Sequence, residues 1–202
     1  MHTKLFVTGA HKGRQTTRAA TVTTKLLPVF AVGCWVVFGL AGSAIAGVLP
    51  KAMSDAEVLG IYIQVNGFDV ETALLGRAQA RSSAVRDLAA QVSSDHLGVR
   101  QAAFDLAAKC KVSPMLPSNR DVAAIEHGRA MTKLTALKGV DFDKAYLEHE
   151  VAFHRAAIDA VRQVLQPSAT CPALKAHFKE ILPALEHHLS ETEGLARELT
   201  AR

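Results

Sequence analysis

Three histidines and one glutamate interrupt apolar stretches of this sequence. The apolar residues around each of them recur every three or four positions, which is the spacing of a buried helix face. The four residues are Glu71, His96, His154 and His188. Neutral imidazole and carboxylate groups are suitable ligands for iron, zinc, copper or manganese. The pattern therefore predicts that four helices bring a transition-metal site into a protein core.

The positions of these residues along their helices agree with one another. Measured from the helix ends on one side, the three histidines lie about 18 to 25 Å into their helices by helix rise. Glu71 lies within about one turn of the same level. Asp95 directly precedes His96, and Glu150 lies one turn before His154. Both are additional candidates, either as ligands or as acceptors for imidazole N–H groups.

A second interpretation of the same residues needs no metal. Buried histidines and acids can satisfy one another through hydrogen bonds and so fix the register of the helices. Motifs of metalloenzymes are missing. His149-Glu150 could begin an H-E-x-x-H zinc motif, but Phe153 occupies the place of the second histidine. None of the three histidines has a carboxylate three residues before it, as di-iron bundles require. The sequence therefore favours a non-enzymatic protein, with one metal ion or none, over a metal-dependent redox enzyme.

The body of the chain is predicted to be one all-α domain over residues 54–200. Aromatic residues make up only 5% of the sequence and alanine is frequent, which favours closely packed helices over β-sheets. Capping residues and prolines divide this body into four long helices and one shorter helix. The helices are expected from Ser54 to the turn at Arg81, from there to about Cys110, from Asp121 to about Leu137, from Asp141 to just before Pro167, and from Thr170 to about Leu199.

The long helices predict a four-helix bundle. The connection over residues 111–140 is long and contains the shorter helix, so it can return the chain along the bundle and leave the second and third long helices parallel. This is a ferritin-like topology, whereas an up-down-up-down bundle needs only a short loop there. The crossover places Cys110 and Cys171 at the same end of the bundle. An oxidising compartment would then allow a disulfide between them, and two unpaired buried thiols are the alternative.

Residues 1–46 are predicted to be a targeting segment. They hold five cations and no acid, and an uncharged apolar run extends from Leu26 to Pro50. Ala44-Ile45-Ala46 fits the small-x-small pattern of a signal-peptidase site, which predicts export to the periplasm with cleavage after Ala46. The alternative is an uncleaved anchor that holds the domain at the outer face of the inner membrane, because 25 uncharged residues can span a bilayer. Membrane contact is expected only through this segment.

The basic character of the chain belongs to this leader. The sequence has a formal net charge of +4. Without the five cations of residues 1–46, 18 cations face 19 acids. The body shows no basic stripe and no aromatic platform, so a nucleic-acid partner is not expected.

Several short motifs occur together in the body of the chain. They are Glu71, Ser94-Asp95-His96, Gly139-Val140-Asp141-Phe142-Asp143, Ala145-Tyr146-Leu147 before His154, and Leu182-Pro183 before His188-Leu189. This set resembles the bacterial exported family called domain of unknown function 4142, which is grouped with ferritin-like folds. The resemblance covers roughly residues 54–199. It implies a helical bundle of the periplasm or envelope with no settled activity, and it does not imply ferroxidase chemistry.

Overall fold

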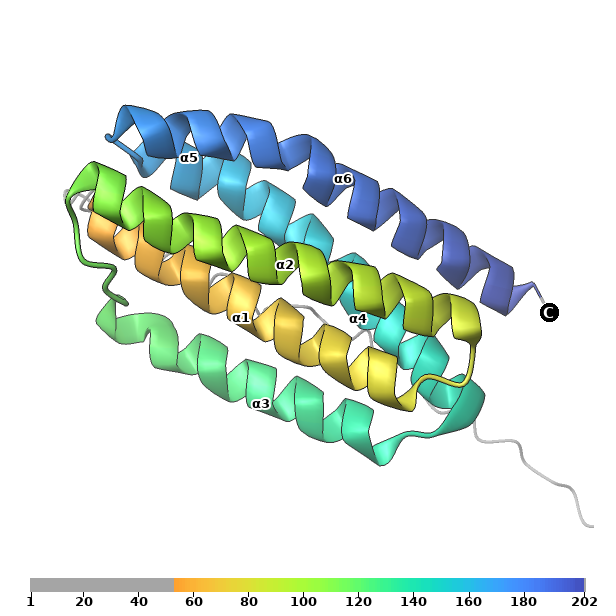
Figure 1. The fold of residues 1–202 in the computed structure, drawn as a ribbon. Coiled ribbons are helices and arrows are strands. Elements are labelled where there is room, and N and C mark those ends of the chain that lie inside the picture. The colour runs from red at the N-terminus through yellow and green to blue at the C-terminus, as the bar shows by residue number, and fades with distance from the viewer. Residues whose placement is uncertain (1–52, 202) are drawn as a thin grey trace, which may run out of the picture. The chain divides into compact units, whose positions relative to one another are not determined.

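The computed structural model describes residues 53–201, and this part of the chain is all-α (Figure 1). The long helices are α1 (Asp55–Gln79), α2 (Ser83–Cys110), α4 (Gly139–Ala160) and α6 (Pro172–Thr200). The shorter elements are the 3-10 turn η1 (Ser118–Arg120), α3 (Asp121–Ala136), the π-helical segment η2 (Val161–Leu165) and α5 (Gln166–Ser168). Residues 53–201 contain no strand and no helix that is long and apolar enough to cross a membrane. The targeting segment predicted over residues 1–46 lies outside the described residues.

The first two long helices form an antiparallel hairpin (Figure 1). The predicted capping box begins α1: the Ser54 hydroxyl accepts the Glu57 N–H, and the Glu57 carboxylate accepts the Ser54 N–H. Ser82 precedes α2, but its side chain makes no capping bond. Instead the buried carboxylate of Asp143 on α4 accepts the backbone N–H groups of Arg81 and Ser82, each at 2.8 Å. The turn is therefore fixed by α4 rather than by its own serine.

The connection after α2 passes very close to α1 at Gly60. The Met115 N–H donates to the carbonyl of Ala56 at 2.9 Å. A Cβ atom at Gly60 would lie 2.2 Å from the carbonyl oxygen of Met115, so only glycine allows this approach. The helix α3 then runs along the outside of α1, and α4 runs in the same direction as α2 (Figure 1). The connection between α2 and α4 thus contains a helix, as the sequence predicts.

A disulfide joins Cys110, the last residue of α2, to Cys171, with the two Cα atoms 5.9 Å apart. The pairing expected from the sequence is therefore present. The helix α6 begins at Pro172 with Cys171 as its N-cap, and the expected capping residue Thr170 does not fill that role. The carboxylate of Asp55 accepts the hydroxyl of Thr170 and the backbone N–H groups of Thr170 and Cys171. The first residue of α1 thus caps α6 from outside the helix.

The helix α4 differs from the prediction at both ends. It begins at Gly139, two residues before the expected cap Asp141, and Gly139 has a left-handed φ of 62°. At the other end α4 stops at Ala160, but the chain stays helical through η2 and α5 to Ser168, whereas the sequence predicts an end of the helix before Pro167. Pro167 lies in the first turn of α5, directly after the wider π turn, where its missing N–H is tolerated.

The buried core is divided along its length into two apolar clusters. One contains Leu59 of α1 and Phe178 of α6, and the other contains Ala73 of α1 and Phe142 of α4. A polar layer lies between them, near the middle of the long helices. This polar layer consists of Asp69, His96, Glu150, His154 and His188, each at most 4% exposed. Apolar packing on both sides therefore keeps these five side chains away from bulk water.

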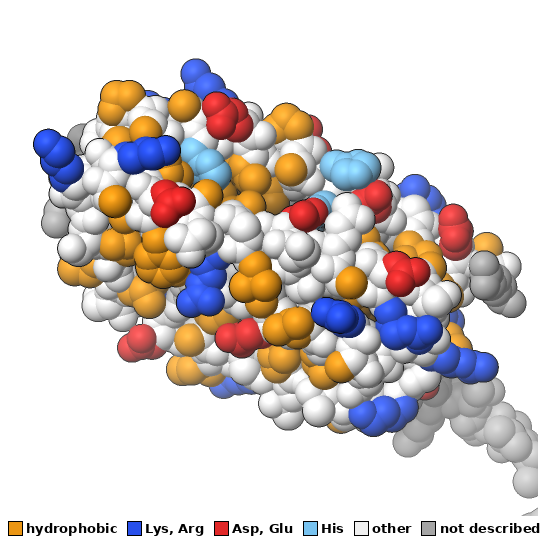
Figure 2. All heavy atoms as spheres, in the orientation of Figure 1, with side chains coloured by type: hydrophobic (Ala, Val, Ile, Leu, Met, Phe, Trp, Pro, Cys, Tyr) orange, Lys and Arg blue, Asp and Glu red, His pale blue; other side chains and the backbone are white. Residues whose placement is uncertain are grey.

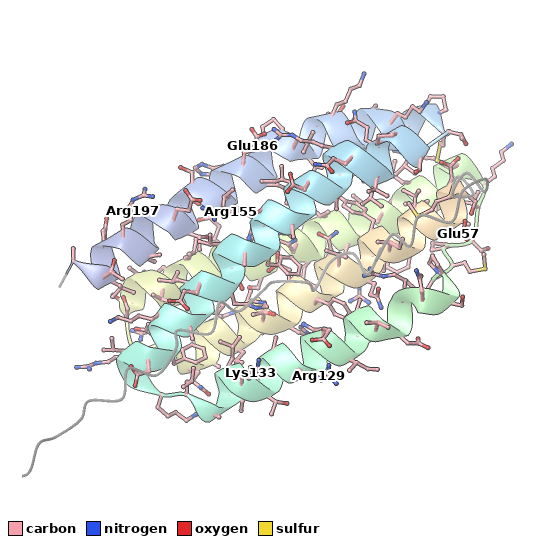
Figure 3. All side chains as sticks on the ribbon, turned by 180° about the vertical axis from the view of Figure 1, so that it is seen from behind. Glu57, Arg129, Lys133, Arg155, Glu186 and Arg197 are labelled. Carbon is pink, nitrogen blue, oxygen red and sulfur yellow. A yellow bond between two sulfur atoms is a disulfide. The ribbon has the colours of Figure 1, made fainter. Side chains whose placement is uncertain are left out.

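Ion pairs join α6 to the helical run of α4 and η2 on the outside of the bundle. Arg155 pairs with Glu193 and Arg162 pairs with Glu186; Arg155 and Glu186 are labelled in Figure 3. Exposed pairs of this kind contribute at most about 1 kcal/mol each. They align the two helices, while the apolar clusters supply most of the stability.

Candidate metal centre

The three histidines predicted from the sequence come together in the polar layer. They are contributed by α2, α4 and α6, and their ring centroids lie 5.4 to 5.6 Å apart in each pair. Donor atoms of His96, His154 and His188 lie within 4.8 Å of one another, and so do those of Asp69, Glu150 and His154. The two groups share His154. The polar layer is therefore one continuous set of potential ligands.

Hydrogen bonds determine which nitrogen of His96 can bind a metal. Its Nδ1 lies 2.9 Å from Oδ1 of Asn66, whose amide group donates to the carbonyl of Tyr62 at 2.8 Å. An amide oxygen can only accept, so Nδ1 of His96 carries a hydrogen. The Nε2 atom lies 3.0 Å from Oδ2 of Asp69 and is the nitrogen available as a ligand.

His154 is held in the same way. Its Nδ1 donates to the backbone carbonyl of Glu150 at 3.0 Å. Its Nε2 is buried, has no hydrogen-bond partner among residues 53–201 and lies 3.7 Å from Oδ2 of Asp69. Burial lowers the pKa of His154 although the charge of Asp69 acts in the opposite direction. The ring is therefore neutral at pH 7, and its lone pair points into the polar layer.

Asp95, one of the two additional candidates, orients His188. The Nε2 atom of His188 lies 3.0 Å from Oδ2 of Asp95, whose side chain is 51% exposed. The Nδ1 atom of His188 is buried and has no hydrogen-bond partner in the described part of the chain. Each imidazole therefore has one N–H held by an acceptor and one nitrogen available: Nε2 of His96, Nε2 of His154 and Nδ1 of His188.

The predicted ligand Glu71 does not belong to the polar layer. Its side chain is 62% exposed and accepts a hydrogen bond from Nε2 of His127 on α3 at 2.8 Å. Asp69, two residues earlier, occupies the place on α1 that the sequence assigned to Glu71. Because α3 covers the outer face of α1, apolar residues also occur on that face, and Phe68 stacks on His127 with ring centroids 4.3 Å apart.

The sequence of α1 contains two series of residues at helical spacing. Asp69 belongs to the less apolar of the two. The positions of α1 that are buried and recur at helical spacing are 62, 66, 69, 73 and 76. Three of these positions hold Asn66, Asp69 and Gly76. The stripe through Phe68 is more apolar and is displaced by one residue, so periodicity alone selected the face toward α3.

The other additional candidate, Glu150, is a member of the polar layer. It is fully buried, and neither of its carboxylate oxygens has a hydrogen-bond partner within residues 53–201. Burial raises the pKa of Glu150 well above its usual range, and the charge of Asp69 raises it further. Burial by itself would also raise the pKa of Asp69. The charges of the nearby His96 and His154 outweigh burial, so the pKa of Asp69 is lowered. Without a bound ion, Asp69 is therefore the ionised member of the pair, and Glu150 keeps its proton to a higher pH than an exposed glutamate does.

The same charges determine how strongly His96 holds its proton. Burial by itself lowers the pKa of His96, but the charge of Asp69 at 3.0 Å outweighs burial and raises the pKa overall. The imidazole and the carboxylate thus share a proton between Nε2 and Oδ2. A metal ion placed between these two atoms would replace that proton.

The distances between donor atoms suit a first-row transition metal. In a tetrahedral site with ligands about 2.1 Å from the metal, neighbouring ligand atoms lie about 3.4 Å apart. The Oδ2 atom of Asp69 lies 3.0 Å from Nε2 of His96 and 3.7 Å from Nε2 of His154. Imidazole ligands favour zinc, iron or copper, and the carboxylate of Asp69 also suits manganese, whereas calcium and magnesium require mainly oxygen ligands. The residues present therefore fit the ions expected from the sequence.

The other histidines within residues 53–201 lie outside the polar layer. His127 is buried, because α3 packs on α1. His149 and His177 are half-buried: burial lowers the pKa of His149 to about 4, and Nε2 of His177 lies 2.9 Å from the hydroxyl of Tyr62. The side chain of His187 is 64% exposed.

Comparisons with known proteins agree with the resemblance seen in the sequence. The model of a protein family, described as domain of unknown function (DUF4142), matches residues 42–195. The chain therefore belongs to this family. Comparisons with curated proteins and with solved structures gave no match.

Proposed function

We propose that this member of the DUF4142 family is an exported metal-binding protein that holds one divalent transition-metal ion in its helical core. The ligands are Asp69, His96, His154 and His188. Glu150 is the fifth member of the polar layer and takes part as a ligand or as the group that releases a proton. The protein is proposed to bind the ion without catalysing a reaction.

The observation that carries this proposal is the set of available nitrogens. Three buried imidazoles each use one ring nitrogen for a bond to a fixed acceptor. Donor atoms of the three rings lie within 4.8 Å of one another. Metal-bound histidines are generally oriented in this way by an acceptor outside the ligand shell. The acceptors are Asn66, the Glu150 carbonyl and Asp95, and they come from three different helices.

The charge of the polar layer supports the same conclusion. In the described part of the chain, the ion-pair partners of Asp69 and Glu150 are all histidines. Two buried carboxylates that lack a lysine or arginine partner are costly when both are ionised. A divalent cation would compensate both charges once Glu150 releases its proton.

The fold and location form part of the proposal. We assign the four long helices to a ferritin-like four-helix bundle, with α3 in the crossover between α2 and α4. Residues 1–46 act as a signal peptide or as an anchor, so that the bundle faces the periplasm. The Cys110–Cys171 disulfide supports this location, because disulfides persist in oxidising compartments.

Calorimetric titration of the full chain, first stripped with a chelator, tests the function. Zinc or cobalt(II) should bind at one ion per chain. An excess of about 100 times the dissociation constant should add about 2.7 kcal/mol of stability, which raises the melting temperature by about 5 to 10 °C. His188→Ala should abolish this rise. His187→Ala is the matched control, because it removes the neighbouring exposed histidine and should leave binding unchanged.

The alternative function is a structural one, in which the polar layer only fixes the register of the helices. The 3.0 Å contact between His96 and Asp69 favours it, because the pair is satisfied without a metal. This alternative predicts that zinc and cobalt(II) leave the melting temperature unchanged. His188→Ala would then destabilise the protein equally with and without added metal.

A further inference from the structure

A surface groove between α2 and α6 reaches the polar layer. Its volume is about 480 Å³, and its lining includes Asp95, His96, Gly98, His177 and His188. Figure 2 views the face on which α2 and α6 meet, and histidine side chains are visible there beside acidic ones. The groove therefore touches two of the proposed ligands from the solvent side.

The exposure of the polar layer decreases away from this groove. The side chains of His188 and His96, which line it, are 5% and 4% exposed. Asp69, on α1, is 1% exposed, and His154, on α4, is 0% exposed. The two ligands nearest to solvent are thus the two that line the groove.

The mouth of the groove carries a negative charge. Asp95 uses Oδ2 to hold His188, and its side chain is half exposed, so it can also contact a solvated cation. Burial lowers the pKa of His177, although the charge of Glu180 acts in the opposite direction. His177 is therefore neutral at pH 7 and does not repel a cation.

The other described cavities do not offer a comparable route. A groove of about 410 Å³ on the opposite side of α2 is lined by Gly67, Phe68 and Phe104, and none of its lining residues belongs to the polar layer. A cavity of about 20 Å³ touches His96 but is lined mainly by apolar side chains such as Phe153 and Leu185. Crossing an apolar cavity would cost a hydrated ion its solvation.

We propose that the groove between α2 and α6 is the path by which a divalent metal ion enters and leaves the polar layer, with Asp95 as its first contact. This inference rests on the proposed metal-binding function. The ion passes from the Asp95 carboxylate to Nδ1 of His188 and Nε2 of His96, and then reaches Asp69 and His154.

A substitution that fills the groove tests this path. A Cβ atom at Gly98, which lines the groove, meets no described atom within 4 Å, so the backbone accepts a side chain there and Gly98→Phe adds a ring at the wall of the groove. Gly67→Phe is the matched control: it also adds a ring at an open helical glycine, but in the groove that lacks ligands. Uptake of cobalt(II) by the metal-free full chain is followed by absorbance after rapid mixing. Release is followed after addition of excess EDTA.

Gly98→Phe should slow uptake and release alike, by about tenfold or more, and leave the dissociation constant within about twofold of the wild type. Gly67→Phe should change neither rate. Unchanged rates in Gly98→Phe would overturn the path. A changed dissociation constant with an unchanged uptake rate would overturn it too, because the ring would then act on the site rather than on access.

A second variant keeps the inference testable if Gly98→Phe does not fold. Asp95→Asn retains an acceptor for His188 but removes the charge at the mouth. It should slow cobalt(II) uptake by about threefold or more at low salt, and the difference should shrink at high salt. Asp105→Asn, an exposed change elsewhere on α2, is its control. Equal uptake rates in the two variants would overturn the role of Asp95. A wild type that binds no cobalt(II) would refute the proposed function itself.

Discussion

Asn66→Ala tests the reasoning that the protein selects one nitrogen of His96 for the metal. Asn66 is 4% exposed and accepts the hydrogen on Nδ1 of His96 at 2.9 Å. Alanine removes this acceptor and leaves the Nδ1 hydrogen unpaired in the core. The imidazole can then turn or change its tautomer, and Nε2 is no longer held toward Asp69.

Two effects of different size should follow. An unsatisfied buried donor costs about 1 to 3 kcal/mol, which lowers the melting temperature of a domain of this size by about 2 to 12 °C. Loss of an acceptor that orients a metal-bound histidine weakens metal binding by about 10- to 100-fold, or about 1.4 to 2.7 kcal/mol. The affinity change is the diagnostic one, because any buried polar truncation can lower stability.

Cobalt(II) titration and thermal unfolding measure the two effects on the same samples. Thr72→Ala is the matched control. Thr72 is also buried on α1, and its hydroxyl donates a hydrogen bond to the carbonyl of Phe68, but it lies outside the polar layer. It should lower stability and leave the cobalt(II) affinity unchanged. Long-range proton–nitrogen NMR of the metal-free wild type, at a pH where His96 is neutral, should show its hydrogen on Nδ1. Wild-type affinity in Asn66→Ala, or a hydrogen on Nε2, would refute the reasoning.

Three further predictions concern the close contact near α1, the disulfide and the buried glutamate. Gly60→Ala should lower the free energy of unfolding, measured in urea, by about 1 to 3 kcal/mol because its Cβ meets a backbone carbonyl. Gly67→Ala, its control, should be neutral or stabilising by up to about 1 kcal/mol. Equal free energies of unfolding in the two variants would contradict the close approach of the chain at Gly60. Replacing Cys110 and Cys171 together by serine should cost about 4 kcal/mol, from the 61-residue separation that the disulfide closes, and a loss below about 1 kcal/mol would argue against the bridge. Burial and a neighbouring carboxylate raise the pKa of Glu150, so the metal-free wild type should lose stability as pH rises above the ordinary value of 4.5 toward the folded pKa, by about 1.4 kcal/mol for each pH unit. Glu150→Gln should lack this part of the loss, and parallel stability-versus-pH curves for the two proteins would contradict it.

The sequence predicts the helices and the three histidines well because both depend on local spacing. Apolar residues at helical intervals and strong caps such as Ser54 define where the helices lie. His96, His154 and His188 each stand out because the helix around them has one apolar face and one polar face. Their common depth follows from helix rise, and their ring centroids lie within 5.6 Å of each other.

The errors arise where tertiary contacts decide the outcome. Because α3 covers the outside of α1, that helix is apolar on two faces, and periodicity favours the more apolar face, next to Glu71, over the face of Asp69 that lies toward the histidines. The capping of α6 by Asp55 depends on a contact between residues 115 or more positions apart in the chain. The π turn before Pro167 is likewise invisible to rules that treat proline as the end of a helix.

X-ray absorption at the zinc edge, on the full chain loaded with one equivalent of zinc, tests the central claim most directly. The metal should be surrounded by three imidazole nitrogens and at least one carboxylate oxygen, at about 2.0 to 2.1 Å. His188→Ala should remove one imidazole from this shell, and His187→Ala should not. A shell of water oxygens, or one with fewer than two imidazoles, would contradict the claim that the polar layer is a metal site.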